Sequence, residues 1–503
     1  MEKFHFIGII IYFTVLAGLS CYGLHRYLMI YLYYKYRKQS VLPVGRFTVL
    51  PRVTVQLPLY NEMYVAERLL NAVAALDYPP NKLEIQVLDD STDETSQIVA
   101  RKVVELRQRG FAVTHVQRVN RRGFKAGALQ HGLPLATGEL IAIFDADFVP
   151  QPELLQQTIH YFTDPGVGML QTRWGHLNEP FSLLTRIQSI LLDAHFLIEQ
   201  TARSRSGRFF NFNGTGGIWR RSCIEAAGGW QADTLAEDLD LSYRAQIKGW
   251  RFLFLPDVVT PAELPVEMSA FKTQQHRWAK GSAQAMKKML PKLWRAPLPL
   301  KIKIEGTMHL TSNLGYLLLF TLCLVFRSSA YAGAHVVTGG NELTKLCLVD
   351  IPLFLAASLS VTAFYVCAQI ELHAQWWKRL LYLPLMMAVG VGLSLNNARA
   401  VLEALFNHES DFIRTPKAGS QSRSAARGPS SYRSLRGLIP FFEIAFGLYF
   451  SYIMVDALYR AQWLSAVFVL VFQVGFLYVG VMSLVPVGGW FRRSAPVLAP
   501  ASA

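Results

Sequence analysis

The sequence predicts an α/β domain with a mostly parallel, doubly wound sheet, joined to an α-helical transmembrane region. Two observations support this fold class. The 503-residue chain is 51% hydrophobic and only 17% charged, whereas soluble globular proteins carry about 25% charged residues. Its apolar residues are also unevenly distributed, because long uncharged runs lie on both sides of a stretch with ordinary soluble composition. This length and composition exclude a disordered protein, a disulfide-stapled miniprotein and a coiled coil.

Residues 1–38 are predicted to form an N-terminal transmembrane anchor. Residues 6–24 are uncharged and apolar, which is long enough to cross a hydrocarbon core of about 30 Å. The basic residues Lys35, Arg37 and Lys38 follow this run, whereas a secretory signal carries its charge before the apolar segment. We therefore expect an uncleaved anchor whose N-terminus lies outside.

Residues 50–290 are predicted to form a cytoplasmic α/β domain. Short β-branched or apolar runs alternate there with polar helical stretches, a pattern typical of a parallel sheet covered by helices. The expected strands are residues 53–57, 84–88, 112–116 and 140–144. Ligands of such sheets bind beyond the carboxyl ends of the strands, so the acidic groups that follow these runs are candidate site residues.

Residues 300–490 are predicted to return to the membrane. The candidate spans are residues 304–326, 346–370, 438–458 and 463–485. Basic loops mark the cytoplasmic side, and the loop 409–436 contains Arg414, Lys417, Arg423, Arg427, Arg433 and Arg436. A full span at residues 380–395 would place this loop outside. We therefore expect five spans in the chain, an interfacial helix near 380–400 and a cytoplasmic C-terminus.

Two stretches, residues 181–200 and 271–293, mix apolar and basic residues at helical spacing. This pattern is typical of helices at a membrane interface, but also of surface helices that pack on their own domain.

The net charge of +15 would suggest nucleic acid in a soluble protein. Here the basic residues gather beside predicted spans, so we expect membrane lipids and no nucleic acid as partners. The five cysteines form no CxxC pair, so neither a zinc site nor a disulfide framework is indicated.

Three acidic motifs follow predicted strands or begin predicted helices. Asp145-Ala-Asp147 ends a strand, where two carboxylates can hold a hard divalent cation that neutralises a diphosphate; acidic pairs there can also be solvated turn residues. Asp89-Asp90-Ser-Thr-Asp93 and Glu237-Asp238-Leu-Asp240 stand where helices begin, so capping is the alternative explanation for both. Position alone does not choose a catalytic base among the three motifs.

The segment Gln274-Gln-His-Arg277-Trp278 lies in the second amphipathic stretch. A guanidinium can pair with phosphate, and an indole offers a flat apolar face to a sugar ring. The alternative is a membrane-surface helix with an interfacial Trp and Arg.

Taken in order, these motifs resemble the membrane-embedded family 2 glycosyltransferases, which include the cellulose, chitin and hyaluronan synthases. The resemblance rests on Pro58-Leu-Tyr-Asn-Glu62, Asp89-Asp90, Lys125-Ala-Gly127, Asp145-Ala-Asp147, Glu237-Asp238 and Gln274-x-x-Arg277-Trp278. It continues through Gln171-Thr-Arg-Trp174, Leu183-Leu-Thr-Arg186, His195-Phe-x-x-Glu-Gln200 and Phe212-Asn-Gly-Thr215. The chain looks most like plant cellulose-synthase-like mannan and glucan synthases and their bacterial relatives. The resemblance covers nearly all of residues 52–287, is looser in the membrane region, and implies a GT-A-like fold.

The resemblance also implies roles for individual residues. Asp238 would be the general base, and Asp145 and Asp147 would hold Mg²⁺ or Mn²⁺. The donor-binding set would be Tyr60, Glu62, Asp90, Lys125, Asp145 and Arg277. Gln274 and Trp278 would bind the acceptor. Residues 412–417 resemble the FxVTxK gating loop of cellulose synthases through Phe412, Thr415 and Lys417, with Arg414 in place of Val.

The implied activity is inverting, processive transfer of a hexose from UDP-glucose or GDP-mannose to a growing β-linked polysaccharide, coupled to export. A cytoplasmic or Golgi-type membrane would hold such an enzyme. One alternative is a non-processive enzyme that adds one sugar to a lipid such as ceramide or diacylglycerol. Another is a transporter with a regulatory domain, which would place ionisable residues inside several spans. Asp350, Glu443 and Asp456 lie near predicted span ends, where an interfacial position explains them.

Overall fold

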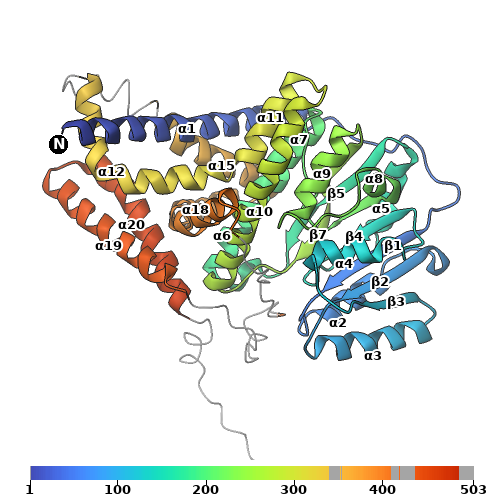
Figure 1. Cartoon of the computed structure of the whole chain (residues 1–503). Helices are drawn as coiled ribbons and strands as arrows, with labels where there is room; N and C mark the ends of the chain where they lie inside the picture. The colour runs from blue at the N-terminus through green and yellow to red at the C-terminus, as the bar shows by residue number, and fades with distance from the viewer. Residues whose placement is uncertain (1, 339–351, 353, 409–418, 420–436, 486–503) are drawn as a thin grey trace, which may run out of the picture.

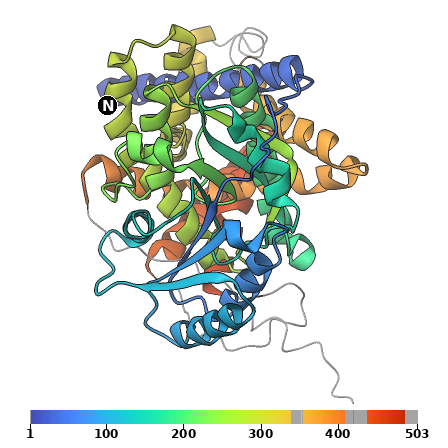
Figure 2. The same ribbon diagram turned by 90° about the vertical axis from the view of Figure 1, so that its right-hand side faces the viewer.

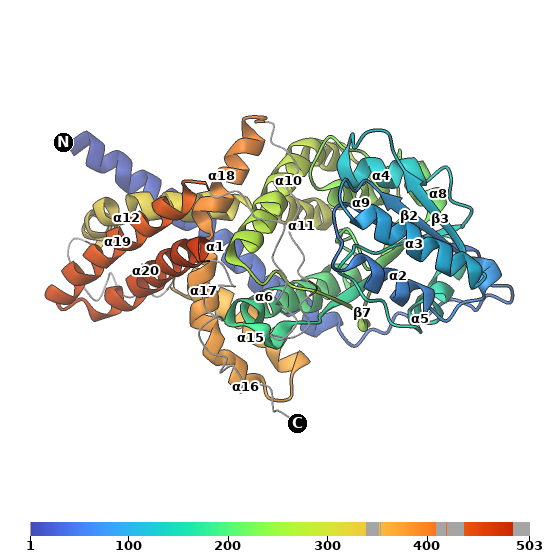
Figure 3. The same ribbon diagram turned by 90° about the horizontal axis from the view of Figure 1, so that it is seen from below.

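In the computed structural model, the described residues are 2–338, 352, 354–408, 419 and 437–485. A sheet with its covering helices forms one end of the molecule, and long helices form the other (Figure 1). The same division is visible from below, where α10 (Met268–Arg295) runs between the two parts (Figure 3).

Seven strands form a single mixed sheet in the order β3-β2-β1-β4-β6-β5-β7. The strands are β1 (Val53–Leu59), β2 (Leu83–Asp89), β3 (Ala112–Gln117), β4 (Leu140–Ile143), β5 (Val167–His176), β6 (Gly217–Arg220) and β7 (Arg251–Ala262). All neighbours run parallel except that β6 is antiparallel to both β4 and β5. The four expected strands are confirmed to within two residues at each end, and so is the mostly parallel sheet. Figure 2 looks onto this end of the molecule.

Helices cover both faces of the sheet, because successive strand residues point to opposite sides. On one face, Val53, Val55 and Leu57 pack with residues of α2 (Ala66–Ala74) and α3 (Thr95–Gln108). On the other, Ile141 and Ile143 pack with residues of α4 (Phe124–Gly132), α8 (Arg221–Ala226) and α9 (Glu237–Ile247). Burial on both faces explains the nearly continuous apolar runs of the sequence and confirms the doubly wound fold class.

The remaining elements follow the chain order. In the sheet domain they are η1 (Pro80–Lys82), α5 (Leu154–Thr158), η2 (Ile159–Thr163), η3 (Glu179–Phe181), α6 (Leu183–Ala194), the π-helix η4 (His195–Gln200) and α7 (Thr201–Arg205). In the helical part they are α1 (Glu2–Tyr36), α11 (Leu300–Thr311), α12 (Leu314–Thr338), η6 (Phe354–Leu359), α15 (Ser360–Leu372), α16 (Trp376–Arg379), η7 (Leu380–Tyr382), α17 (Leu383–Gly392), α18 (Ser394–Leu405), α19 (Ile439–Tyr459) and α20 (Trp463–Leu484).

Within the described residues, five helical segments are long and apolar enough to cross a membrane. They are Ile7–Tyr36, Leu355–Leu372, Trp376–Leu405, Ile439–Tyr459 and Ser465–Leu484. Large apolar side chains such as Leu448 and Val455 on α19 are more than 60% exposed, as expected of a surface that faces lipid. The expected span at 304–326 falls on two helices, α11 and α12, which are bent by 54° and together meet the length and composition of one further span.

The stretch 380–395 lies inside the segment Trp376–Leu405, which meets the length and composition of a span because α18 extends it. The interfacial helix near 380–400 and the outside position of the N-terminus therefore stay predictions.

The two amphipathic stretches form the junction between the sheet domain and the apolar helices. The first, residues 181–200, includes α6, which contacts β5 but also α15 and α17; the second includes α10, which contacts α9, α11, α18 and α20. Lys272 of α10 forms a buried ion pair with Glu443 of α19, with 2.7 Å between the nitrogen and oxygen atoms. The alternative of helices that pack only on their own domain is therefore wrong. These helices hold the two parts of the chain together.

Candidate active site

A cavity of about 1680 Å³ opens at this junction. Its wall includes all the predicted donor, metal, base and acceptor residues that fall in the described part of the chain. These are Tyr60, Glu62, Asp90, Lys125, Asp145, Asp147, Asp238, Gln274, Arg277 and Trp278. The predicted gating-loop residues Phe412, Thr415 and Lys417 lie outside the described residues. The motifs are far apart in sequence, and the fold brings them to one place.

Parallel pairing of β1 with β2 and β4 sets the donor side of the cavity. Beyond β1 and β2, the Asp90 N–H donates to the Leu59 carbonyl oxygen (2.9 Å), and the Asn61 N–H donates to Ser91 Oγ (2.9 Å). Asn61 has a φ of 54°, a left-handed conformation that Asn tolerates better than most residues. These bonds hold the turns after the two strands side by side, so Tyr60 and Asp90 face the same space.

Asp90 is not a helix cap. Arg118 Nε donates to Asp90 Oδ1 (2.9 Å), and its terminal nitrogen donates to the other oxygen. The helix after this motif begins only at Thr95, whose N–H bonds with Asp93. The expected helix therefore begins just after this motif, and capping accounts for Asp93 but not for Asp90, which pairs with Arg118. Asp89 likewise contacts His115 Nε2 at 2.9 Å.

Arg118 and Arg121 are two functional candidates that sequence reasoning missed. Arg121 stacks on Tyr60, with 3.3 Å between its guanidinium carbon and the ring centroid. Both arginines come from the segment between β3 and α4, next to the Lys125-Ala-Gly127 motif. The run Arg118 to Arg122, with three arginines in five residues, was the available signal.

Asp145 and Asp147 follow β4 and form the candidate metal site. The Asp145 N–H donates to Thr215 Oγ1 (2.8 Å), and Lys125 Nζ lies 2.5 Å from Asp145 Oδ1. The Asp145 side chain is 34% exposed, and Asp147 is buried. Within the described residues, no group of three or more His, Cys, Asp or Glu side chains could hold a metal. Mg²⁺ is usually held by one or two carboxylates and substrate phosphates, so this pair fits a cation whose shell a diphosphate completes.

Asp238 stands in the first turn of α9, across Gly214 from Lys125. A Cβ at Gly214 would lie 3.2 Å from Asp238 Oδ2 and 3.4 Å from Lys125 Nζ, and Lys125 Nζ donates to the Gly214 carbonyl oxygen (2.9 Å). Burial and the neighbouring Glu237 charge raise the pKa of Asp238 to about 7. A carboxylate with such a pKa can take a proton near neutral pH, which suits a general base.

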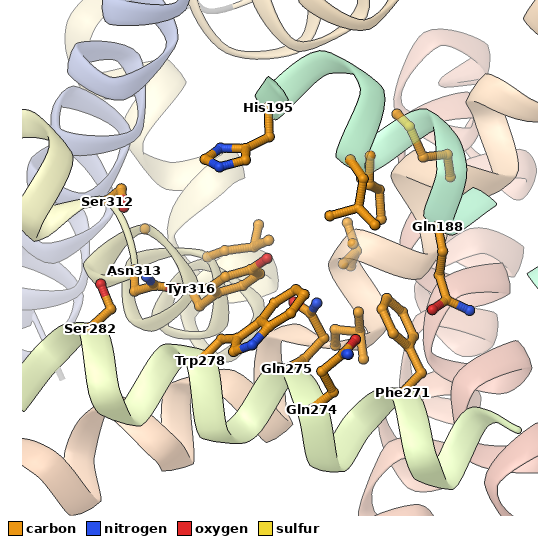
Figure 4. A pocket seen from close by; sticks show the side chains of 18 of the residues that line it. Gln188, His195, Phe271, Gln274, Gln275, Trp278, Ser282, Ser312, Asn313 and Tyr316 are labelled. Atoms are coloured by element: carbon orange, nitrogen blue, oxygen red, sulfur yellow. The ribbon is translucent and has the colours of Figure 1, made fainter. Parts of the chain in front are cut away.

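The predicted acceptor residues lie on α10, opposite the π-helix η4. In Figure 4, Gln274 and Trp278 point from α10 into the cavity, and His195 points into it from the opposite side. His195 and Glu199 belong to the motif His195-Phe-x-x-Glu-Gln200. The motif alone predicts no role for these side chains, because i, i+4 spacing does not reveal a π-helix.

Comparison with known proteins relates the sheet domain to one protein family. Residues 51–281 match the protein family described as "Glycosyltransferase like family 2". The chain is 41% identical over 268 residues to glucomannan 4-beta-mannosyltransferase 1 of Oryza sativa subsp. japonica, with 52% of this chain and 51% of that protein covered. It is 43% identical over 250 residues to glucomannan 4-beta-mannosyltransferase 2 of Arabidopsis thaliana, with 49% and 47% covered. The matches thus span about half of the length of these relatives.

Among solved structures, the chain is similar to the mannosyltransferase PcManGT from Pyrobaculum calidifontis in complex with GDP-Man and Mn²⁺. The TM-score is 0.51 at 23% identity, with 79% of this chain and 99% of that chain covered. This similarity supports the fold, and it confirms the expectation of a GT-A-like domain.

Proposed function

Because residues 51–281 match the family described as "Glycosyltransferase like family 2", we propose that the protein transfers mannosyl units from GDP-mannose to a growing β-linked mannan or glucomannan. The observation that carries this proposal is the single cavity that unites the donor, base and acceptor motifs. The choice of mannose is supported by the relatives named glucomannan 4-beta-mannosyltransferase. UDP-glucose is the competing donor.

The proposed reaction is a single displacement with inversion. An acceptor hydroxyl attacks the anomeric carbon of the α-linked donor, the new C–O bond forms on the opposite face, and the bond to the diphosphate breaks. Asp238 takes the hydroxyl proton, and GDP leaves with the bonding electron pair. Lys125 and Arg277 supply positive charge to the leaving group. Mg²⁺ or Mn²⁺ held by Asp145 and Asp147 would add Lewis-acid stabilisation of the diphosphate.

The proposed function also includes elongation of the product polysaccharide and its export across the membrane. The cavity wall continues from Trp278 to residues of the apolar helices, among them Tyr12 of α1, Leu319 of α12 and Phe472 of α20. A space that begins at the base and extends between apolar helices could receive the product chain after each transfer. The enzyme would then work in a membrane, with its sheet domain on the cytoplasmic side.

A donor and product assay tests the proposal. Purified protein in detergent is given GDP-mannose, UDP-glucose or UDP-N-acetylglucosamine, each with Mg²⁺ or Mn²⁺, and the product is sized and digested with linkage-specific hydrolases. We expect a polymer from GDP-mannose that a β-1,4-mannanase degrades. Asp257→Asn, at an exposed position of β7, is the control and should match the wild type. One sugar attached to a lipid would favour the non-processive alternative, and a polymer from UDP-glucose alone would overturn the choice of donor.

A further inference from the structure

The π-helix η4 places an ionisable side chain, Glu199, in the wall of the cavity. Glu199 follows His195 by one turn, and both line the cavity with Asn213, Asp238 and Trp278. π-Helical turns are rare and often occur at functional sites. The Glu199 side chain is 23% exposed. The reaction as described above gives this carboxylate no role.

The hydrogen bonds of Glu199 use one of its two carboxylate oxygens. Oε2 contacts His195 Nδ1 at 3.0 Å and accepts a bond from an Arg203 terminal nitrogen at 3.2 Å. In the described part of the chain, Oε2 carries all the hydrogen bonds recorded for this side chain. Because the side chain is partly exposed and lines the cavity, Oε1 is the oxygen left for a ligand there.

Arg203 and His195 keep the Glu199 carboxylate charged and hold it in place. Burial alone would raise the pKa of Glu199, but the Arg203 charge and the contact with His195 hold that pKa well below its usual range. Arg203 is 2% exposed and is itself held by Glu305, which contacts His25 of α1 at 2.9 Å. A carboxylate fixed in this way needs no reorganisation to accept a hydrogen bond from a ligand.

Glu199 is also connected, through His195, to the backbone beside Asp238. His195 Nε2 lies 2.9 Å from Asn213 Nδ2, and Asn213 precedes Gly214, which separates Lys125 from Asp238. On the far side of the cavity stands Trp278, which faces His195 in Figure 4. A sugar ring bound at the indole would therefore lie between Trp278 and the π-helix.

We propose that the Glu199 carboxylate binds a hydroxyl group of the acceptor saccharide and so positions the acceptor between Trp278 and the base Asp238. This inference rests on the proposed function, since it names a contact that a saccharide acceptor would make. Hydrogen bonds from neutral hydroxyls to a carboxylate are charge-assisted and short. A lipid acceptor has one reacting hydroxyl and gains less from such a contact than a polyhydroxylated chain end.

A purely structural role for Glu199, as one partner of Arg203, is the competing explanation, and Glu305 provides the matched control. Glu305 contacts the same guanidinium at 2.9 Å from the other side, and its side chain is only 2% exposed. Glu305→Gln therefore removes an ion-pair partner from the same guanidinium without removing a charge from the cavity wall.

The test compares Glu199→Gln, Glu199→Asp and Glu305→Gln with the wild type. Initial rates are measured with GDP-mannose and a β-1,4-linked mannotetraose acceptor, and GDP release without acceptor is measured separately. We expect Glu199→Gln to raise the KM for mannotetraose about 10- to 100-fold, as for loss of a hydrogen bond to a charged group. The KM for GDP-mannose and the acceptor-free release of GDP should stay within about twofold. Glu199→Asp, which keeps the charge, should recover part of the acceptor affinity, and Glu305→Gln should raise the acceptor KM much less than Glu199→Gln does.

Two results would overturn the inference. The first is an unchanged acceptor KM in Glu199→Gln. The second is an equal loss in Glu199→Gln and Glu305→Gln, which would assign both to the ion pair. If Glu199→Gln does not elute as the wild type does in size exclusion, Glu199→Asp alone decides, since it must then show a raised acceptor KM with an unchanged donor KM. A wild-type protein that releases GDP but extends no saccharide would reject the proposed function, and this inference with it.

Discussion

Lys125 Nζ lies 2.5 Å from Asp145 Oδ1, so the cation of one candidate donor-binding motif neutralises a carboxylate of another. Both side chains line the cavity, and Lys125 also donates to the Gly214 carbonyl oxygen beside Asp238. The ammonium group thus stands between the candidate metal site and the candidate base. A divalent cation on Asp145 would compete with Lys125 for the same oxygen.

This relationship predicts opposite effects of Lys125→Met on metal binding and on catalysis. Asp145 would lose its competing cation, so Mn²⁺ should bind at least as tightly as in the wild type, measured by electron paramagnetic resonance. The transfer rate should fall about 10²- to 10³-fold, because one fixed charge near the leaving group is lost. Lys102→Met, which removes an ion pair with Glu105 on α3, is the control. Loss of Mn²⁺ binding in Lys125→Met would contradict this prediction.

The pKa of about 7 at Asp238 predicts the acid limb of the pH profile. A general base acts only when ionised, so kcat/KM should fall about tenfold per pH unit below pH 7. The free energy of unfolding changes with pH in the opposite direction to kcat/KM. Because the folded pKa lies above the unfolded value of about 3.9, the stabilising contribution of the carboxyl group is present at low pH and lost as the pH rises through 7.

The same shift predicts that Asp238→Asn, which stays neutral, has a higher Tm than the wild type at pH 8 and a smaller advantage at pH 5. A pH-rate profile and thermal unfolding in detergent measure the two effects. A wild-type profile that is flat from pH 5 to 8 would argue against Asp238 as the base.

A side chain added at Gly214 is expected to displace the neighbouring Asp238 carboxylate. Its φ of 81° is unfavourable for other residues, and a Cβ would lie 3.2 Å from Asp238 Oδ2. Gly214→Ala should therefore lower kcat about 10- to 100-fold by displacing the base, since small displacements of reacting groups are costly. Gly207→Ala is a matched control, because Gly207 has a φ of 67° and a Cβ there meets nothing within 4 Å. Equal losses of kcat in both variants would indicate backbone strain alone.

Asp193 lies where the sheet domain meets the apolar helices, and we expect the loss of its charge to lower the stability of the protein. This buried residue of α6 lies 3.0 Å from His176 of β5 and 3.3 Å from His373, which follows α15. Burial alone would raise the pKa of Asp193, but its contacts with His176 and His373 hold that pKa below its usual range. Its stabilising contribution is therefore present above about pH 3.9 and lost as the pH falls.

Asp193→Ala should accordingly lower the Tm at pH 7 by several degrees, because breaking a buried pair costs about 3–5 kcal/mol. Asp233→Ala removes a carboxylate that is 57% exposed and should change the Tm little. Thermal unfolding of both variants in detergent at pH 7 and pH 4 measures the difference. An Asp193→Ala protein as stable as the wild type would show that this cluster does not hold the sheet domain on the apolar helices.

Much of the site follows from residues that a sequence pattern can locate. Asp145 and Tyr60 come directly after apolar strands, and strand ends of a parallel sheet meet at one edge. The contact between Arg118 and Asp90 could not be predicted in this way, because it depends on how a loop folds after β3. The π-helical placement of His195 and Glu199 could not be predicted for a different reason, since nothing in the sequence separates a π-helical turn from an α-helical one.

The helical part was predicted less completely. Hydropathy located the apolar stretches, but it does not report bends, so the break between α11 and α12 was missed. Charge asymmetry was used to assign residues 380–395 to an interface, whereas length and composition also permit a span at Trp376–Leu405. Packing of α17 against α20, which depends on residues nearly a hundred positions apart, could not be read from either pattern.

The most direct test of the central claim is mannosyl transfer by Asp238→Asn compared with its binding of GDP-mannose. The structure places this carboxylate in the cavity beside Gly214 and Lys125, with a pKa suited to a base. We predict that the variant inserts in the membrane and binds GDP-mannose with wild-type affinity by calorimetry, while polymer formation falls about 10²- to 10⁴-fold. Transfer by Asp238→Asn at near wild-type rate would contradict the assignment of the base and the mechanism built on it.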